Sequence, residues 1–240
     1  MGRIIVVRHG QASYGQQDYD RLSELGVRQC EMLGRYYAER GWRFERVVVG
    51  PRRRHWQSHD AMAAAFRAAG GSTTSVWPDP VEDPALDEYQ AFEVMDHFAP
   101  GHRQILDNSE EGRRRYFLLY RQTMRRWLRG ESPDDGPATN IESWGKFRAR
   151  VASSMERLRE SLANGGAERT ILAVTSGGPM AAAAGYALGL DDLKTMEQSW
   201  MVSNGSFSEF LVSRTAEEDR FSMLSFNATP HLDPDLVTGA

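Results

Sequence analysis

Three short apolar runs, set far apart along the chain, constrain the fold more than any other feature of the sequence. They are Ile4–Val7, Val47–Val49 and Thr170–Val174. Short continuous runs of this kind are typical of strands that are buried on both faces. Segments with helical spacing separate them, which predicts right-handed βαβ units and a mostly parallel sheet with helices on both faces.

Helix signals follow each of these runs. The first predicted helix has Ser23 as its candidate N-cap and Gly41 as its candidate stop. Its apolar residues recur at helical spacing: Leu22, Leu25, Met32, Leu33 and Tyr36. Pro51 is expected to open a second helix that reaches about Ala69, and Pro179 to open another by occupying its first position.

The stretch from Asp79 to Asn140 is less regular and is punctuated by prolines. It contains one strong helix whose apolar stripe lies among arginines: Tyr116, Tyr120, Met124 and Trp127. We expect residues 90–140 to form an insertion beside the main sheet, or a lid over its strand ends.

Further segments complete the predicted fold. "SVW" (75–77) suggests a short third strand, and Ile141–Leu162 suggests a helix. Near the end, "SFSEFLV" and "RFSMLSF" alternate enough to form a closing antiparallel pair. We therefore expect one domain over residues 1–240: a three-layer α/β sandwich with a mostly parallel sheet, an antiparallel edge strand and the helical insertion.

Composition excludes several classes of protein. A net charge of −4 argues against a nucleic-acid binder, and no apolar run is long enough to span a bilayer. The first residues are too weakly apolar to suggest a signal peptide. Cys30 is the single cysteine, which excludes an intramolecular disulfide and a cysteine metal site. We expect a cytoplasmic protein.

The residues that follow the buried strands are suited to phosphate. Arg8 and His9 follow the first run, Arg54 follows the second, and the turn at Gly177 follows the third. Ligands of parallel sheets bind at the carboxyl ends of the strands. Arginine forks and a helix N-terminus match phosphate oxygens, so we predict that Arg8, Arg54 and Gly177 bind phosphate, together with Gln11 and Ser13 of the first loop.

His9 is a candidate nucleophile, because a neutral imidazole has a lone-pair nitrogen that can attack phosphorus. The neighbouring arginines should lower its pKa and keep it neutral. A leaving oxygen also needs a proton. The segment from Glu82 to Gln90 supplies carboxylates, among which Asp87 and Glu88 are best placed and Glu93 competes.

These segments resemble the histidine phosphatase superfamily, the phosphoglycerate-mutase-like proteins. The similarity covers nearly the whole chain outside residues 90–140. It is carried by an ordered set of segments: "VVRHGQAS", "DRLSELGVRQCEMLG", "GPRRRHWQSHDAM", "LDEY", "ESWGKFRARV", "NGSFSEFLV" and "FNATPHL".

The resemblance implies a mechanism on a small phosphorylated substrate. His9 takes the phosphoryl group, which Arg8, Arg54 and a second histidine hold. Glu88 protonates the leaving oxygen, and water then hydrolyses the phosphohistidine. The resemblance implies no metal and no organic cofactor, and it favours a phosphatase over a mutase. Arg52 and Arg53 are expected at the surface or rim, and the sequence leaves a homodimer open.

The chain departs from the family pattern in two places. Ser176 stands where similar proteins have the second histidine, and Gly15 stands where many have an asparagine. A serine hydroxyl can donate one hydrogen bond to phosphate but brings no positive charge. His97 or His102 of the insertion could fill part of the gap. The alternative function is a catalytically weakened phosphate- or phosphoester-binding sensor or scaffold.

Two other patterns have simpler explanations. His55 and His59 have metal-ligand spacing, but no third ligand is evident, so we expect a pair on a helix surface. The basic helix from Arg113 to Arg129 raises an RNA-binding module as a third hypothesis. Its aromatic stripe is more simply explained as core.

Overall fold

The computed structural model describes residues 2–13, 20–70, 77–104, 109–131, 141–163, 169–214 and 219–239. Contacts divide the chain into two compact units. The first comprises Met1–Glu88 and Arg150–Ala240, and the second comprises Tyr89–Ala149. Whether residues 90–140 form a lid depends on how the second unit is placed on the first, so the lid stays a prediction. Gly15 lies outside the described residues.

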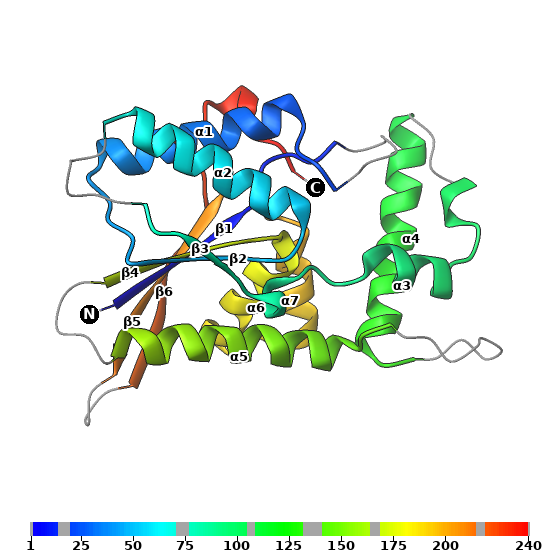
Figure 1. Cartoon of the computed structure of the whole chain (residues 1–240). Coiled ribbons are helices and arrows are strands. Elements are labelled where there is room, and N and C mark those ends of the chain that lie inside the picture. The colour runs from blue at the N-terminus through cyan, green and yellow to red at the C-terminus, as the bar shows by residue number, and fades with distance from the viewer. Residues whose placement is uncertain are drawn as a thin grey trace. The chain divides into compact units, whose positions relative to one another are not determined.

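A six-stranded sheet forms the centre of the described part of the first unit, in the order β3-β2-β4-β1-β5-β6 (Figure 1). Neighbours among β3, β2, β4 and β1 pair in parallel, whereas β5 pairs antiparallel with both β1 and β6. The strands are β1 (Gly2–Arg8), β2 (Arg46–Val49), β3 (Pro80–Glu82), β4 (Arg169–Thr175), β5 (Phe207–Arg214) and β6 (Asp219–Ala228).

The predicted strands are largely confirmed, with one correction. The closing pair is antiparallel as expected, and β6 is the antiparallel edge strand of the sheet. The third strand is Pro80–Glu82 and not "SVW". Within that segment, residues 75 and 76 lie outside the described part, and Trp77 packs into the core instead of pairing with β2.

Helices cover both faces of the sheet, so the α/β sandwich has three layers (Figure 1). Alternation along β1 explains this: Ile5 and Val7 pack toward α1 and α2, whereas Ile4 and Val6 pack toward α5 and α6. The helices of these layers are α1 (Glu24–Glu39), α2 (Arg53–Ala68), α5 (Trp144–Ala163), α6 (Gly177–Leu188) and α7 (Asp192–Ser199).

The helix ends follow the sequence signals with two exceptions. The Ser23 hydroxyl accepts the Gly26 N–H at the start of α1, and Gly41 has a positive φ of 66° just beyond its end. The first exception is α2, which begins at Arg53 with Arg52 as its N-cap, so Pro51 precedes the helix and does not open it. The second is α6, which begins at Gly177, so Pro179 is its third residue and not its first. The first four N–H groups of a helix have no partner within it, so a proline is tolerated there.

The second unit contains α3 (Ala91–Phe98), α4 (Glu110–Leu128) and the first residues of α5. The predicted stripe on α4 packs inward: Met124 and Trp127 are buried. Trp127 contacts the rings of Tyr89 and Trp144.

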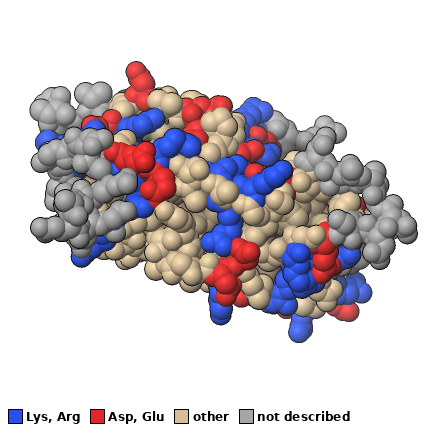
Figure 2. All heavy atoms as spheres, turned by 90° about the horizontal axis from the view of Figure 1, so that it is seen from below, with Lys and Arg blue, Asp and Glu red and all other residues tan. Residues whose placement is uncertain are grey.

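On the molecular face in Figure 2, basic and acidic side chains are interspersed and do not form a single basic field. No helix among the described residues has the length and apolar character needed to cross a bilayer.

Candidate active site

The carboxyl ends of β1, β2 and β4 bring the predicted site residues together. Arg8 is the last residue of β1, and His9 follows it. The His9 N–H donates to the Thr175 carbonyl at 2.8 Å, which extends the pairing of β1 and β4 past the end of β1. Arg54 lies in the first turn of α2, and Ser176 follows β4 directly. Arg8, His9, Arg54 and Ser176 are all buried.

His9 is held in the tautomer that a nucleophile needs. Its Nδ1 lies 2.7 Å from the Gly10 carbonyl oxygen, which can only accept, so Nδ1 carries the hydrogen. Nε2 then has a lone pair, which accepts a hydrogen bond from Arg54 Nε at 3.0 Å. Burial, followed by Arg54, Arg8 and His55, holds the pKa of His9 well below 6.5. At neutral pH the ring is therefore uncharged.

Arg54 connects the parts of the site. Besides His9, it donates through Nη1 to Asp20 Oδ1 at 2.7 Å and through Nη2 to Ser176 Oγ at 3.3 Å. The Asp20 carboxylate also accepts the Arg53 N–H at 3.0 Å, in the first turn of α2. Asp20 thus fixes the guanidinium and balances its charge. The sequence analysis missed this residue, because it lies in a turn with no pattern.

Arg8 and the loop after β1 are fixed by the backbone. Arg8 Nη1 donates to the Val202 carbonyl, and the guanidinium lies next to Gly177 at the start of α6. Gly10 packs directly on α1: a Cβ there would lie 2.2 Å from the Gly26 carbonyl oxygen. The loop can take this path only with a glycine at that position.

Gln11 and Ser13 fasten the same loop to the start of α1. Gln11 Oε1 accepts from the Ser23 hydroxyl at 2.9 Å, and the Gln11 N–H donates to Gln29 Oε1 at 2.9 Å. The Ser13 hydroxyl donates to the Leu22 carbonyl at 3.1 Å. These bonds support the loop. A phosphate contact from either residue stays a prediction.

Ser176 has the backbone of a helix N-cap, but its side chain does not cap α6. Its Oγ lies 2.7 Å from His55 Nε2 and accepts from Arg54. The Glu88 carboxylate takes the place of the cap: its Oε2 accepts the Gly178 N–H at 3.1 Å. The Glu88 carboxyl group therefore lies at the N-terminus of α6.

The two predicted carboxylates have different surroundings. Asp87 is paired with Arg52 Nε at 2.5 Å, at the rim where Arg52 was expected. Glu88 follows it and reaches the start of α6. The Thr175 hydroxyl holds the preceding turn by donating to the Leu86 carbonyl at 2.6 Å. Glu93 is an exposed residue of α3, in the second unit.

The prediction that His55 and His59 lie on a helix surface is wrong. His55 is 0% exposed and His59 is 4% exposed. His55 faces Ser176, and its ring centroid lies 5.8 Å from that of His9. His59 accepts from Trp77 Nε1 at 3.0 Å. Met62 and Phe66 continue the same buried stripe at helical spacing, which was the signal in the sequence that could have placed both histidines inside.

Burial and the neighbouring arginines affect His55 as they affect His9. Burial, followed by Arg54, holds the pKa of His55 well below 6.5, and only the Gly50 backbone opposes this. No group of three or more metal-binding side chains gathers among the described residues. In the second unit, both ring nitrogens of His102 are engaged, by Asp96 at 3.0 Å and Tyr116 at 3.2 Å.

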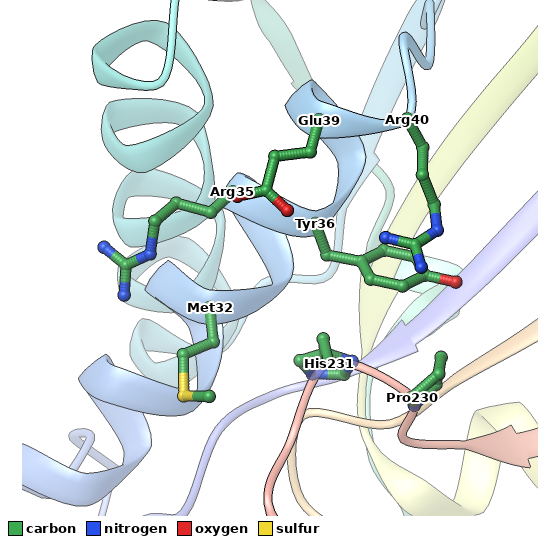
Figure 3. Close-up of a pocket in the computed structure, with 7 residues that line it drawn as sticks. All are labelled: Met32, Arg35, Tyr36, Glu39, Arg40, Pro230 and His231. Carbon is green, nitrogen blue, oxygen red and sulfur yellow. The ribbon is translucent and has the colours of Figure 1, made fainter.

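A hollow lies elsewhere in the first unit, between α1 and the C-terminal tail (Figure 3). It measures about 260 Å³ and contains none of the strand-end residues. Arg40 stacks over the Tyr36 ring at 3.8 Å, and burial lowers the pKa of His231 to about 4. Its lining residues are Met32, Arg35, Tyr36, Glu39, Arg40, Pro230 and His231.

The fold and the site define a class: α/β proteins with a buried neutral histidine, two arginines and a helix N-terminus at the ends of parallel strands. The chain belongs to one family of this class, the histidine phosphatase superfamily (branch 1). The model of that family matches residues 4–105 and 106–229. No curated protein matched the chain in sequence.

Solved structures share the fold at low sequence identity. A mutant phosphoserine phosphatase from Entamoeba histolytica, in complex with phosphoserine, is 17% identical with a TM-score of 0.61, over 97% of this chain and 100% of that one. A mycobacterial glucosyl-3-phosphoglycerate phosphatase is 22% identical with a TM-score of 0.59, over 95% and 99%. A phosphoglycerate mutase from Bacillus anthracis str. Sterne is 15% identical with a TM-score of 0.63, over 95% and 94%.

The lowered pKa values of His9 and His55 predict how stability depends on pH. Below pH 6.5 the unfolded chain protonates these histidines while the folded chain does not, so the unfolded state binds more protons. The free energy of unfolding should then fall with decreasing pH, by up to about 1.4 kcal/mol per pH unit for each histidine. Urea unfolding between pH 7.5 and 5 measures this slope. In His55→Gln, the slope should correspond to about one fewer proton taken up on unfolding. An unchanged slope in that variant would contradict the lowered pKa of His55.

Proposed function

We propose that this protein is a phosphomonoesterase that works through a phosphohistidine intermediate on His9. The observation that carries the proposal is the Nε2 lone pair of neutral His9, which lies beside the Arg54 guanidinium in a buried site. Family membership and the fold of phosphatases and mutases support phosphoester chemistry in general.

In the proposed first step, a phosphate oxygen takes over the hydrogen bond that Arg54 Nε donates to His9 Nε2. The freed lone pair of Nε2 attacks phosphorus, and the bond from phosphorus to the ester oxygen breaks. Arg54 and Arg8 stabilise the transferring oxygens, Gly177 offers a backbone N–H, and the Ser176 hydroxyl adds a neutral donor. Glu88, in its acid form, gives the leaving oxygen a proton. In the second step water attacks phosphorus, Glu88 accepts its proton, and the nitrogen–phosphorus bond breaks.

The substrate in this proposal is a small phosphorylated molecule, and no metal or organic cofactor takes part. We favour hydrolysis over mutase activity, because a mutase must keep the phosphoryl group inside a closed site and return it to substrate. We also propose a cytoplasmic location, which the single cysteine, Cys30, supports, because a chain without an intramolecular disulfide suits a reducing compartment. The proposal includes no nucleic-acid or membrane partner and leaves a homodimer open.

The first prediction concerns the nucleophile. His9→Ala should lower turnover of p-nitrophenyl phosphate by about 10³-fold or more, because no covalent intermediate can form. The matched control is His59→Gln, a buried histidine of α2 bonded to Trp77 and Asp60. Quenched wild-type enzyme should carry phosphate on His9 that is stable in alkali and lost in acid. Turnover that survives His9→Ala would refute the mechanism.

The second prediction concerns the general acid. Glu88→Gln should slow the hydrolysis of an alkyl phosphate much more than that of p-nitrophenyl phosphate, because p-nitrophenolate leaves without a proton. The expected loss for the alkyl ester is about 10²–10⁴-fold in kcat. Asp87→Asn, which breaks the pair with Arg52, serves as the control. Equal losses on both esters would assign the acid to another group.

A sensor or scaffold that binds phosphate with little turnover is the second candidate. It is favoured by one observation: Ser176 is buried and neutral where the resemblance implies a second histidine. That candidate predicts that Ser176→His raises turnover. We expect the reverse, a slower enzyme, because Ser176 is fully buried with its Oγ 2.7 Å from His55 Nε2, so a larger side chain would displace the His55 ring. Initial rates of the two proteins on one ester decide between them.

A further inference from the structure

His55 is a buried titratable group that the proposed mechanism leaves unused. It follows Arg54 on α2, its Nε2 lies 2.7 Å from Ser176 Oγ, and its ring centroid lies 5.8 Å from that of His9 at an angle of 33°. We propose that His55 positions the Ser176 hydroxyl toward the phosphoryl group, so that the two side chains act as one oriented donor. This inference deepens the proposed function and rests on it.

The first argument comes from counting hydrogen bonds at Ser176. A hydroxyl has one hydrogen and two lone pairs. Arg54 Nη2 fills one lone pair at 3.3 Å, and the same guanidinium donates to His9 Nε2 at 3.0 Å. Ser176 Oγ and the nucleophilic nitrogen therefore lie against one guanidinium. Because both atoms contact the same guanidinium, we expect a phosphoryl group on His9 to lie close to the Ser176 hydroxyl.

The second argument concerns the direction of the hydroxyl hydrogen. Phosphoryl oxygens without a proton can only accept, so Ser176 must donate its one hydrogen to make a bond with them. His55 Nε2 then has to carry its own hydrogen and donate to the remaining lone pair of Oγ. With Arg54 on one lone pair and His55 on the other, a single direction is left for the O–H. His55 thereby turns a rotating hydroxyl into an oriented donor.

A third observation shows that the chain makes room for this imidazole. Gly50 joins β2 to the turn before α2, and a Cβ there would lie 2.5 Å from His55 Nδ1 and 3.0 Å from its Cε1. The ring therefore packs against bare backbone. Burial and Arg54 keep the ring neutral, against the effect of the Gly50 backbone. The ring therefore carries one hydrogen, and Nε2 donates to Ser176 in the tautomer whose Nδ1 has none.

His59 provides the comparison within the same helix. It lies one turn further along α2, is also buried, and bonds to Trp77 and Asp60. None of these groups belongs to the site. A purely structural role for His55 would make the two histidines equivalent in their effect on turnover. A positioning role separates them.

The test compares two substitutions at position 55. Glutamine places an amide N–H near the position of the histidine Nε2, whereas the shorter asparagine does not reach Ser176. We expect His55→Asn to lower kcat on p-nitrophenyl phosphate by about tenfold or more, below the ~10²–10³-fold cost of removing a donor itself. His55→Gln should recover most of the loss, with KM changed little. His59→Asn and His59→Gln are the matched controls and should leave kcat near the wild-type value.

A double-mutant cycle tests whether His55 acts through Ser176. Ser176→Ala should lower kcat, and adding His55→Asn should then cost little more, since the hydroxyl to be positioned is gone. The inference is overturned if His55→Asn has wild-type kcat or if His55→Gln is as slow as His55→Asn. It is also overturned if the fold-loss in kcat of the double variant equals the product of the losses in Ser176→Ala and His55→Asn. Circular dichroism of each variant confirms folding, and His55→Phe replaces His55→Asn if the latter does not fold.

The proposed function can fail separately. If the wild-type protein shows no turnover, or turnover that does not depend on His9, the proposed phosphatase is refuted. The pairing of His55 with Ser176 is not refuted by that result. Calorimetry with inorganic phosphate then provides the test. His55→Asn should bind phosphate about 2–10-fold more weakly than wild type, as expected for one hydrogen bond, and His55→Gln should restore the affinity. Equal affinities in wild type and His55→Asn would overturn the inference.

Discussion

The site depends on one guanidinium. Arg54 donates to His9 Nε2, to Asp20 and to Ser176 Oγ, so a single side chain fixes the candidate nucleophile, a balancing carboxylate and the turn that follows β4. A buried cation is costly unless it is paired and hydrogen-bonded. Asp20 meets this requirement from outside the sheet by accepting from Arg54 Nη1.

The register of the sheet places that guanidinium. Val49 pairs with Val174, and β1 pairs with β4 along its whole length, so the chain leaves three neighbouring strands at one edge. From there β1 leads into the loop of His9, β4 leads into the turn of Ser176, and β2 leads by a short turn into α2. Local pairing and the first turn of α2 thus bring His9, Arg54 and Ser176 together.

Much of this arrangement could be predicted from the sequence, because the signals are local. The three buried runs, His9, Arg8, Arg54 and the turn at Ser176 are each identified by residues next to one another in the chain. The sequence did not predict the positions of His55 and Asp20 in the site, because each contacts a partner more than 30 residues away in the chain. The start of α6 was misplaced because Pro179 is compatible with several positions in a first turn.

Ser176 stands where the resemblance implies a histidine, but the site still contains a second histidine. The His55 ring, which comes from α2, lies against Ser176 Oγ and close to His9. In the proposed mechanism, the atom at this position that meets the phosphoryl group is a small neutral hydroxyl and not an imidazole nitrogen. Arg8 and Arg54 then supply the positive charge, while His55 supplies direction, since its bond to Oγ constrains where the hydroxyl can point. Charge and orientation, which one histidine can provide together, are divided between two elements of the fold.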